Sequence, residues 1–289
     1  MEMRLSLTCL AMTTFCFVTL AQASNSEKTE LPRETRVIHS KLVNIDYKIY
    51  VSSPQIADKK KKYPVIFVLD ADYFFPIVQE IMQEHSSKKE SGDAIIVGIT
   101  YPGVSEDKHG PIFERSRTRD YTPTHVTYGG YGEEYQKASG GADTFFDFIE
   151  KELFPYIELN YPALMSDRTL VGISYGGLAT SFALLTRTSD FQKYLIISPS
   201  LWWDQHLLMR LEAEKTKSKK DMPVRVFLSA GELEQGPSAD MPEDVRKFSG
   251  LLHVHNFPSY QDSVWIAPNK THHTVFKEAA KRGLAYLIQ

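Results

Sequence analysis

The chain has 289 residues, 42% of them hydrophobic, and a formal net charge of −3 at pH 7. This length and composition fit one large α/β domain, since such folds often reach about 250 residues without dividing. The slightly acidic balance gives no general attraction to nucleic acid or to anionic membranes, which argues against both as partners.

The first 23 residues have the layout of a secretory signal peptide. Arg4 precedes an almost uncharged apolar run from Leu5 to Leu20, and Ala21-Gln22-Ala23 has the small-x-small pattern of a cleavage site. The run is shorter than the roughly 20 apolar residues of a membrane-spanning helix, which disfavours a stable membrane anchor. We therefore expect an exported protein, periplasmic or secreted, with residues 24–289 as a single mature domain.

Short runs rich in β-branched and aromatic residues recur along this domain and predict strands. Continuous apolar runs of this kind are typical of strands buried on both faces, as in a parallel sheet. The expected strands cover residues 65–69, 94–98, 169–173, 194–198 and 224–229. Two earlier segments, 36–43 and 46–52, alternate more regularly and indicate an antiparallel start to the same sheet.

Helical patterns occupy the intervals between these strands. The expected helices cover residues 144–157, 176–186, 205–217 and 275–288. Strands that alternate with helices predict an α/β fold with a mostly parallel, doubly wound sheet. Residues 101–141 show little periodicity and exceed the usual length of a connection, so we expect a long functional loop or a cap there.

A candidate nucleophile stands where an expected strand meets an expected helix. The segment Gly172-Ile173-Ser174-Tyr175-Gly176 fits the G-x-S-x-G pattern. In that pattern, glycines let the strand and the helix pass close to a serine that sits on a strained turn. The bare pattern is common, but its context here makes an incidental serine the weaker interpretation. We predict an α/β-hydrolase fold with Ser174 as nucleophile.

A serine nucleophile needs a base, and the base needs an acid to orient it. In this fold the chain order is serine, acid, histidine. The loop after the expected strand at 224–229 contains Glu232 and Glu234. We take Glu234 as the first choice for the acid and Glu232 as the second, while either could be a surface charge.

Four histidines follow the acid candidates along the chain. His272 and His273 stand in a loop just before the last expected helix, which is the expected site of the base. Of this pair we favour His272. His253 and His255 alternate within an expected strand at 252–257, so we interpret both as structural.

The oxyanion of an acyl-transfer reaction needs two backbone N–H donors. One is expected from Tyr175, directly after the nucleophile, and the other from Asp72 or Ala71, after the strand at 65–69. Asp70 and Asp72 could instead suggest a metal site, but no partner spacing supports one. We expect neither a metal nor an organic cofactor.

Several further segments carry a resemblance to a known family. They are Leu69 to Phe74, Arg117 to Thr124, Phe145 to Tyr161 and Ser198 to Asp204. Together with the serine motif, they resemble the putative-esterase family of α/β hydrolases, and most closely its periplasmic siderophore-esterase branch. The first segment is similar to that family's Leu-Asp-Gly-Asp-x-Phe loop, except that Ala71 stands where relatives usually have glycine.

The resemblance implies roles for individual residues. It implies Ser174 as nucleophile, His272 as base and an acid at the Gly-x-x-acid position, which is Glu234. Some siderophore esterases are thought to use a Ser–His dyad, so the acid is the least secure of the three.

Candidate substrate contacts come from residues near the ends of expected strands. Trp203 follows a strand terminus, where ligands bind in such sheets. Arg115 and Tyr121 lie in the long segment at 101–141, where charge and stacking could hold an anionic or catechol-bearing substrate. The alternative is that such tryptophans pack in the core and such arginines form ion pairs.

The sequence thus predicts a serine hydrolase that cleaves a small-molecule carboxylic ester, such as a ferric siderophore, through an acyl-enzyme. A dedicated siderophore trilactone esterase and an acyltransferase remain open, because both would use the same nucleophile. A non-catalytic binding protein is disfavoured, because both Ser174 and His272 are present. The oligomeric state is left open.

Overall fold

Eight strands form one sheet within the residues that the computed structural model describes, which are 32–54, 61–87, 93–104, 110–236 and 239–288. The described residues cluster as one compact unit. The expected signal peptide at residues 1–23 lies outside the described residues. Within them, no helix is long and apolar enough to cross a membrane.

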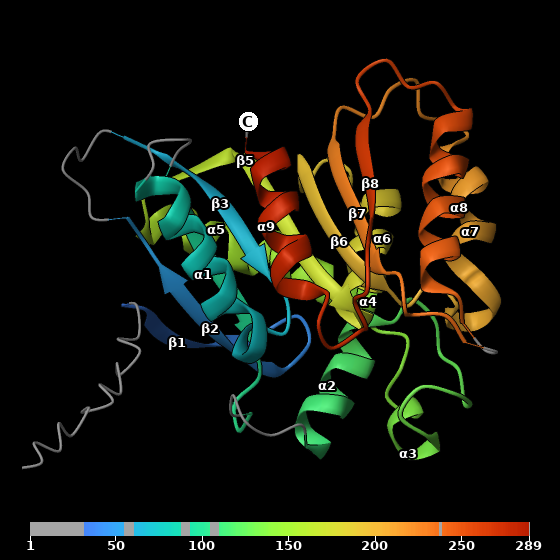
Figure 1. The fold of residues 1–289 in the computed structure, drawn as a ribbon. Coiled ribbons are helices and arrows are strands. Elements are labelled where there is room, and N and C mark those ends of the chain that lie inside the picture. The colour runs from blue at the N-terminus through green and yellow to red at the C-terminus, as the bar shows by residue number, and fades with distance from the viewer. Residues whose placement is uncertain (1–31, 55–60, 88–92, 105–109, 237–238, 289) are drawn as a thin grey trace, which may run out of the picture. The chain divides into compact units, whose positions relative to one another are not determined.

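The sheet has the order β1-β2-β4-β3-β5-β6-β7-β8 (Figure 1). Its strands are β1 (Glu34–Ser40), β2 (Ile45–Ser52), β3 (Tyr63–Val68), β4 (Ile95–Thr100), β5 (Ala163–Ser174), β6 (Lys193–Pro199), β7 (Arg225–Gly231) and β8 (Gln261–Ala267). β2 runs antiparallel to both β1 and β4, whereas β4, β3 and β5 to β8 are mutually parallel. The expected mostly parallel sheet with an antiparallel start is confirmed.

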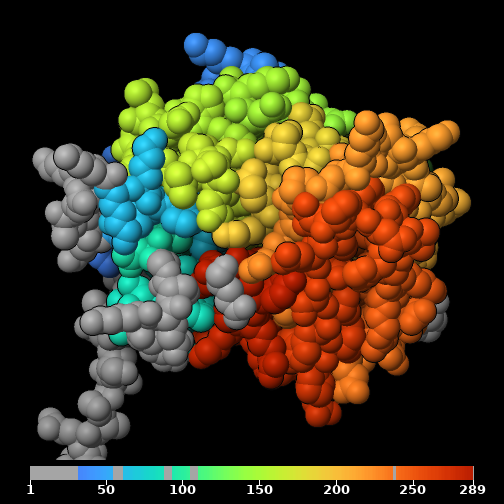
Figure 2. All heavy atoms as spheres, turned by 90° about the horizontal axis from the view of Figure 1, so that it is seen from above, coloured from blue at the N-terminus to red at the C-terminus, as the bar shows by residue number. Residues whose placement is uncertain are grey.

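Helices cover both faces of this sheet, as the doubly wound prediction requires. One face carries α1 (Ala71–Ser87) and α9 (Phe276–Leu287). The other carries α4 (Ala142–Phe148), a π-helical turn (Ile149–Leu153), α5 (Phe154–Asn160), α6 (Tyr175–Thr186), α7 (Trp203–Thr216) and α8 (Met241–Val254). Seen from above, the red end of the chain lies beside the teal residues of α1 (Figure 2), and the Lys277–Glu80 ion pair joins α9 to α1.

The two apolar layers explain why the central strands are apolar throughout. In β3, Val65 and Phe67 pack under α4 to α6, whereas Ile66 and Val68 pack under α1 and α9. Because both faces are buried, polar residues have no favourable position in such a strand. The apolar runs were therefore strong signals for the parallel strands.

Two expectations about local structure need correction. The expected strand at 252–257 is wrong, because α8 continues to Val254. Val245, Phe248 and Leu252 follow helical spacing and are all buried, so Leu252 belongs to a helix face. The segment at 101–141 also contains two helices, α2 (Pro111–Tyr121) and α3 (Glu133–Gln136), which lie near the carboxyl ends of the parallel strands (Figure 1).

Candidate active site

Ser174 occupies a strained turn between β5 and α6. Its backbone has φ 60° and ψ −122°, a conformation that residues other than glycine rarely adopt. A Cβ atom on Gly172 would lie 2.2 Å from the Gly176 carbonyl oxygen, and one on Gly177 would lie 2.9 Å from the Ile197 carbonyl oxygen. Glycine is therefore required on both sides of the serine for the helix to pass this close to the sheet.

His272 and Glu234 form a close pair after β8 and β7. His272 Nδ1 lies 2.6 Å from Glu234 Oε2, which suits an N–H donating to a carboxylate. The other carboxylate oxygen accepts hydrogen bonds from Ser198 Oγ and from the Gly231 N–H, each at 2.6 Å. The Glu234 side chain is only 4% exposed. These contacts fix the carboxylate, so the pairing orients the imidazole and leaves Nε2 for other partners.

The other candidate acids and bases lie in different surroundings. Glu232 is exposed and accepts a hydrogen bond from the Asn269 N–H at 2.9 Å. His273 is exposed. His253 and His255 pair with carboxylates of their own, at 2.7 and 2.8 Å. The structure therefore pairs Glu234 with His272, whereas Glu232, His253 and His255 have other partners.

Ser174 and His272 line the same cavity, which has a volume of about 520 Å³. The described residues show no hydrogen bond between the two side chains, a looseness that is common in active sites without substrate. Other parts of the wall come from residues 126–131, residues 200–205, Ala239 and Met241. The cavity lies beside the carboxyl ends of β5 and β6, where ligands bind in parallel sheets.

The turn between β3 and α1 lies beside the nucleophile. Asp70 has φ 51°, and its carboxylate would lie 3.3 Å from a Cβ atom on Gly176. The backbone N–H groups of Ala71 and Asp72 donate to no acceptor among the described residues, as expected in a first helical turn. Tyr175 likewise begins α6 with its N–H unbonded in the described part of the chain. These donors have the chemistry that an oxyanion requires.

The Asp72 side chain anchors this turn in the core. Its carboxylate is buried and accepts hydrogen bonds from Tyr50 OH at 2.6 Å, from Lys48 Nζ at 2.8 Å and from the Thr100 hydroxyl. Burial alone lowers the pKa of Lys48, but hydrogen bonding to Asp72 and Tyr50 outweighs it, and the net pKa is raised. Asp72 thus has a structural role in its side chain, separate from its backbone N–H.

A buried ion pair anchors the same turn from the other side. Arg117 donates from Nε and Nη2 to the two oxygens of Asp70, at 3.1 and 2.9 Å. Burial lowers the pKa of Arg117, but the charge and hydrogen bonding of the Asp70 carboxylate help to outweigh that effect. The net pKa is raised, so the guanidinium stays charged. The sequence indicated neither the pairing of Arg117 with Asp70 nor the contact of Ser198 with Glu234, because nothing local shows which carboxylate each side chain meets.

The expected substrate residues are placed in three different environments. Trp203 is almost fully buried and lines the cavity. Tyr121 is buried behind the β3–α1 turn, where its hydroxyl accepts a hydrogen bond from the Asp70 N–H at 3.1 Å. Arg115 is exposed and pairs with Glu134 at 2.6 Å. Neither Tyr121 nor Arg115 is among the described residues that line the cavity.

The chain is similar in sequence to known esterases. Residues 40–264 match the family model described as putative esterase. The chain is 33% identical over 230 residues to the ferri-bacillibactin esterase BesA of Bacillus subtilis, covering 76% of this chain and 77% of that protein. It is 32% identical over 202 residues to a siderophore triacetylfusarinine C esterase of Aspergillus fumigatus, covering 66% and 65% of the two chains.

Solved structures agree in fold. The BES protein from Bacillus cereus superimposes with a TM-score of 0.75 and 29% identity, over 89% of this chain and 96% of that one. An IroE-like serine hydrolase from Shewanella oneidensis also gives a TM-score of 0.75, with 27% identity, over 89% and 80% of the two chains.

Proposed function

This chain belongs to the putative-esterase family of carboxylic ester hydrolases, and from that premise we propose that it acts through an acyl-enzyme on Ser174. The observation that carries the proposal is the His272–Glu234 pair, 2.6 Å apart, beside the cavity that Ser174 also lines. A fixed imidazole next to a serine on a strained turn is the arrangement that nucleophilic ester cleavage requires.

The reaction proceeds in two steps. His272 Nε2 accepts the Ser174 proton as Oγ attacks the ester carbonyl carbon, and the alcohol leaves with that proton. Backbone N–H groups of Tyr175 and Asp72 stabilise the negative oxygen of each tetrahedral intermediate. Water then attacks the acyl-enzyme and gives a proton to His272, which passes it to Ser174 Oγ as the acyl–oxygen bond breaks and the carboxylic acid is released. The base must be neutral, so the rate falls when His272 is protonated.

The substrate class is proposed from the relatives. The two relatives described above are named as a ferri-bacillibactin esterase and a siderophore triacetylfusarinine C esterase, so a small siderophore ester is the favoured substrate. The same nucleophile would serve an acyltransferase in which an alcohol replaces water, and product analysis with and without added alcohol separates the two. We also propose that the protein is exported and that residues 24–289 form a single mature domain. Within it, residues 101–141 contribute part of the cavity wall.

The test is fluorophosphonate labelling of the folded protein with peptide mapping, followed by kinetics of substituted variants. We expect label on Ser174 alone. Ser174→Ala and His272→Ala should each lower kcat on a short-acyl ester by about 10⁴-fold or more, because either change disables the whole unit. His273→Ala is the matched control and should stay within about twofold of the parent. A folded sample with Ser174 unlabelled contradicts the proposal.

A further inference from the structure

The cavity beside Ser174 has an unusual charge pattern. The described residues that line it include neither lysine nor arginine. Among the described lining residues, Asp204 is the one acidic side chain, and His272 is the one basic side chain. Aromatic rings supply much of the remaining surface, namely Tyr128, Tyr131, Tyr175, Trp202 and Trp203. Such a wall suits a flat, uncharged group.

Asp204 is held in place by side-chain contacts. Its carboxylate accepts a hydrogen bond from Thr124 Oγ1 at 2.8 Å, and Thr124 Oγ1 in turn accepts one from Trp203 Nε1 at 3.1 Å. The described residues provide no ion-pair partner for this carboxylate. It is therefore a fixed negative charge on the cavity wall that forms no ion pair among the described residues.

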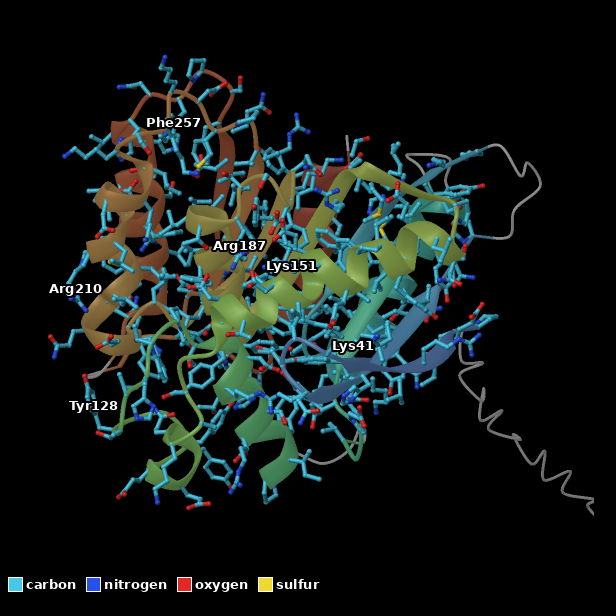
Figure 3. The ribbon with its side chains drawn as sticks, turned by 180° about the vertical axis from the view of Figure 1, so that it is seen from behind. Lys41, Tyr128, Lys151, Arg187, Arg210 and Phe257 are labelled. Atoms are coloured by element: carbon cyan, nitrogen blue, oxygen red, sulfur yellow. The ribbon has the colours of Figure 1, made fainter. Side chains whose placement is uncertain are left out.

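The backbone at Asp204 is also unusual. Asp204, Gln205 and His206 are three consecutive residues with left-handed φ values of 45°, 55° and 59°. Arg210 braces this turn by donating to the Asp204 carbonyl oxygen at 2.7 Å and to the Gln205 carbonyl oxygen at 3.2 Å. Figure 3 shows Arg210 and Tyr128 on the same side of the domain. Strain of this kind persists where the surrounding structure enforces it, and it concentrates at ligand sites.

Neighbouring buried charges do not reverse the negative sign of the charge on the cavity wall. Arg117 lies behind the wall, 5.2 Å from the Tyr175 ring and 5.7 Å from the Tyr131 ring, but Asp70 compensates its charge. Glu234, beneath His272, adds a second carboxylate close to the cavity. The Arg210 guanidinium also lies beside Asp204, but it donates to backbone carbonyl oxygens and does not line the cavity. With His272 neutral, as the base must be, the one charged side chain on the described wall is the Asp204 carboxylate, which disfavours anions there.

We propose that this cavity takes an uncharged aromatic acyl group, and that Asp204 is the residue that selects against anionic substrates. The inference rests on the proposed function and narrows its substrate class. The selection by Asp204 would act against substrates with a free carboxylate near the scissile ester, and equally against polyanionic metal chelates. Like-charge juxtaposition is an established source of specificity, because it penalises the wrong substrate without strengthening the right one.

The experiment uses three umbelliferyl esters with the same leaving group. Their acyl parts are benzoate, 4-carboxybenzoate and 4-(trimethylammonio)benzoate, and each kcat/KM is divided by the rate of hydroxide hydrolysis of the same ester. We expect the wild type to cleave the neutral ester at least about tenfold better than the anionic one. Raising the salt concentration should reduce this preference, because ions screen the charge.

Two matched variants separate charge from structure. Asp204→Asn keeps an acceptor for Thr124 and tolerates the left-handed backbone, so it removes only the charge. It should raise the anionic-to-neutral ratio of kcat/KM about fivefold and abolish the salt dependence of that ratio. Thr124→Val keeps the charge but loses the hydrogen bond, and should leave the ratio within about twofold of wild type.

A second substrate pair tests the same idea at larger size. An iron-free catecholate trilactone should be opened faster than its trianionic ferric complex. Equal or faster cleavage of the anionic member in both pairs, with no change in Asp204→Asn, overturns the inference even if Ser174 is labelled and the neutral ester is cleaved. Failure of labelling would instead count against the proposed function itself.

Discussion

At the scale of single residues, Glu234 shows how the site is fixed. Its two oxygens are fully used, because Oε1 accepts from Ser198 and the Gly231 N–H while Oε2 meets His272. A buried carboxylate held by three donors cannot rotate without leaving polar groups unpaired. Its orientation, and therefore that of the imidazole, is set before substrate arrives.

Replacing this carboxylate by an amide should therefore disable the base. In Glu234→Gln the carbonyl oxygen can keep its bonds from Ser198 and Gly231, which turns the amide NH₂ toward His272 Nδ1. The ring then carries its proton on Nε2 and cannot accept one from Ser174. We expect kcat to fall by about 10²- to 10⁴-fold with little change in KM, measured on a neutral aryl ester.

Glu232→Gln is the control for this prediction. Its carboxylate is exposed and contacts only the Asn269 N–H among the groups described, so activity should remain within about twofold. If Glu234→Gln is folded and equally active, the protein works with a Ser–His dyad and the assigned role of the acid is wrong.

The sequence indicated these catalytic candidates because their position along the chain carries the information. Ser174 has a local motif, Glu234 follows an expected strand, and His272 stands in the loop before the last expected helix, in the order that the fold uses. Tyr121 and Arg115 have no such signal. Whether an aromatic or basic residue in an irregular segment meets a substrate, a backbone N–H or a surface carboxylate depends on the path of that segment.

At the scale of elements, the turn from β5 to α6 depends on close packing of backbone. A Cβ atom on Gly172 would lie 2.2 Å from the Gly176 carbonyl oxygen and 2.5 Å from Thr180 Oγ1. The first of these atoms is main chain in a buried helix, so it cannot move aside cheaply. The glycine is thus required by the fold as well as by the nucleophile that it flanks.

Gly172→Ala should consequently lower the free energy of unfolding by about 3 kcal/mol, measured by urea denaturation. Gly250→Ala is the matched control, since Gly250 lies within α8 and a Cβ atom there would meet nothing within 4 Å. It should raise stability by about 0.5–1 kcal/mol, because alanine loses less backbone entropy in a helix. Equal effects of the two substitutions would contradict the packing argument.

Elements buried on both sides were the easiest to predict. β3 to β7 were all anticipated, because their side chains face apolar layers above and below the sheet. β8 was missed, since it lies at the edge of the sheet and has only one fully buried residue, Ala267. The apolar run of β8 is limited to Val264–Ala267, and the polar residues Gln261, Asp262 and Ser263 before it resemble those of a loop.

At the scale of the whole molecule, the parallel sheet brings the site together from distant parts of the chain. The turns after β3 and β5 and the loops after β7 and β8 all lie at the carboxyl ends of parallel strands. They supply, respectively, Asp72, Ser174, Glu234 and His272. This convergence follows from topology and was predictable. The cavity wall was not predictable from the sequence, because it depends on how residues 126–131 meet residues 200–205.

Buried charge away from the site also affects the stability of the whole domain. Asp190 is only 6% exposed, and Ser189 Oγ lies 3.3 Å from its carboxylate. Burial, with repulsion from Glu150, raises the pKa of Asp190 above its ordinary value. The folded state therefore holds this proton more tightly than the unfolded state does.

Asp190→Asn should stabilise the domain at neutral pH and not in acid. A raised folded-state pKa gives a contribution that is complete below the unfolded pKa of about 3.9 and is lost as pH rises through the folded value. The amide does not ionise and so does not lose this contribution. At about pH 7.5 the free energy of unfolding, measured in urea, should be up to about 1 kcal/mol higher for the variant than for the parent, and this difference should shrink toward pH 4. Glu133→Gln, which alters an exposed carboxylate, should show no pH-dependent difference beyond about 0.3 kcal/mol. A gain for Asp190→Asn of the same size at both pH values would mean that packing, rather than ionisation, causes it.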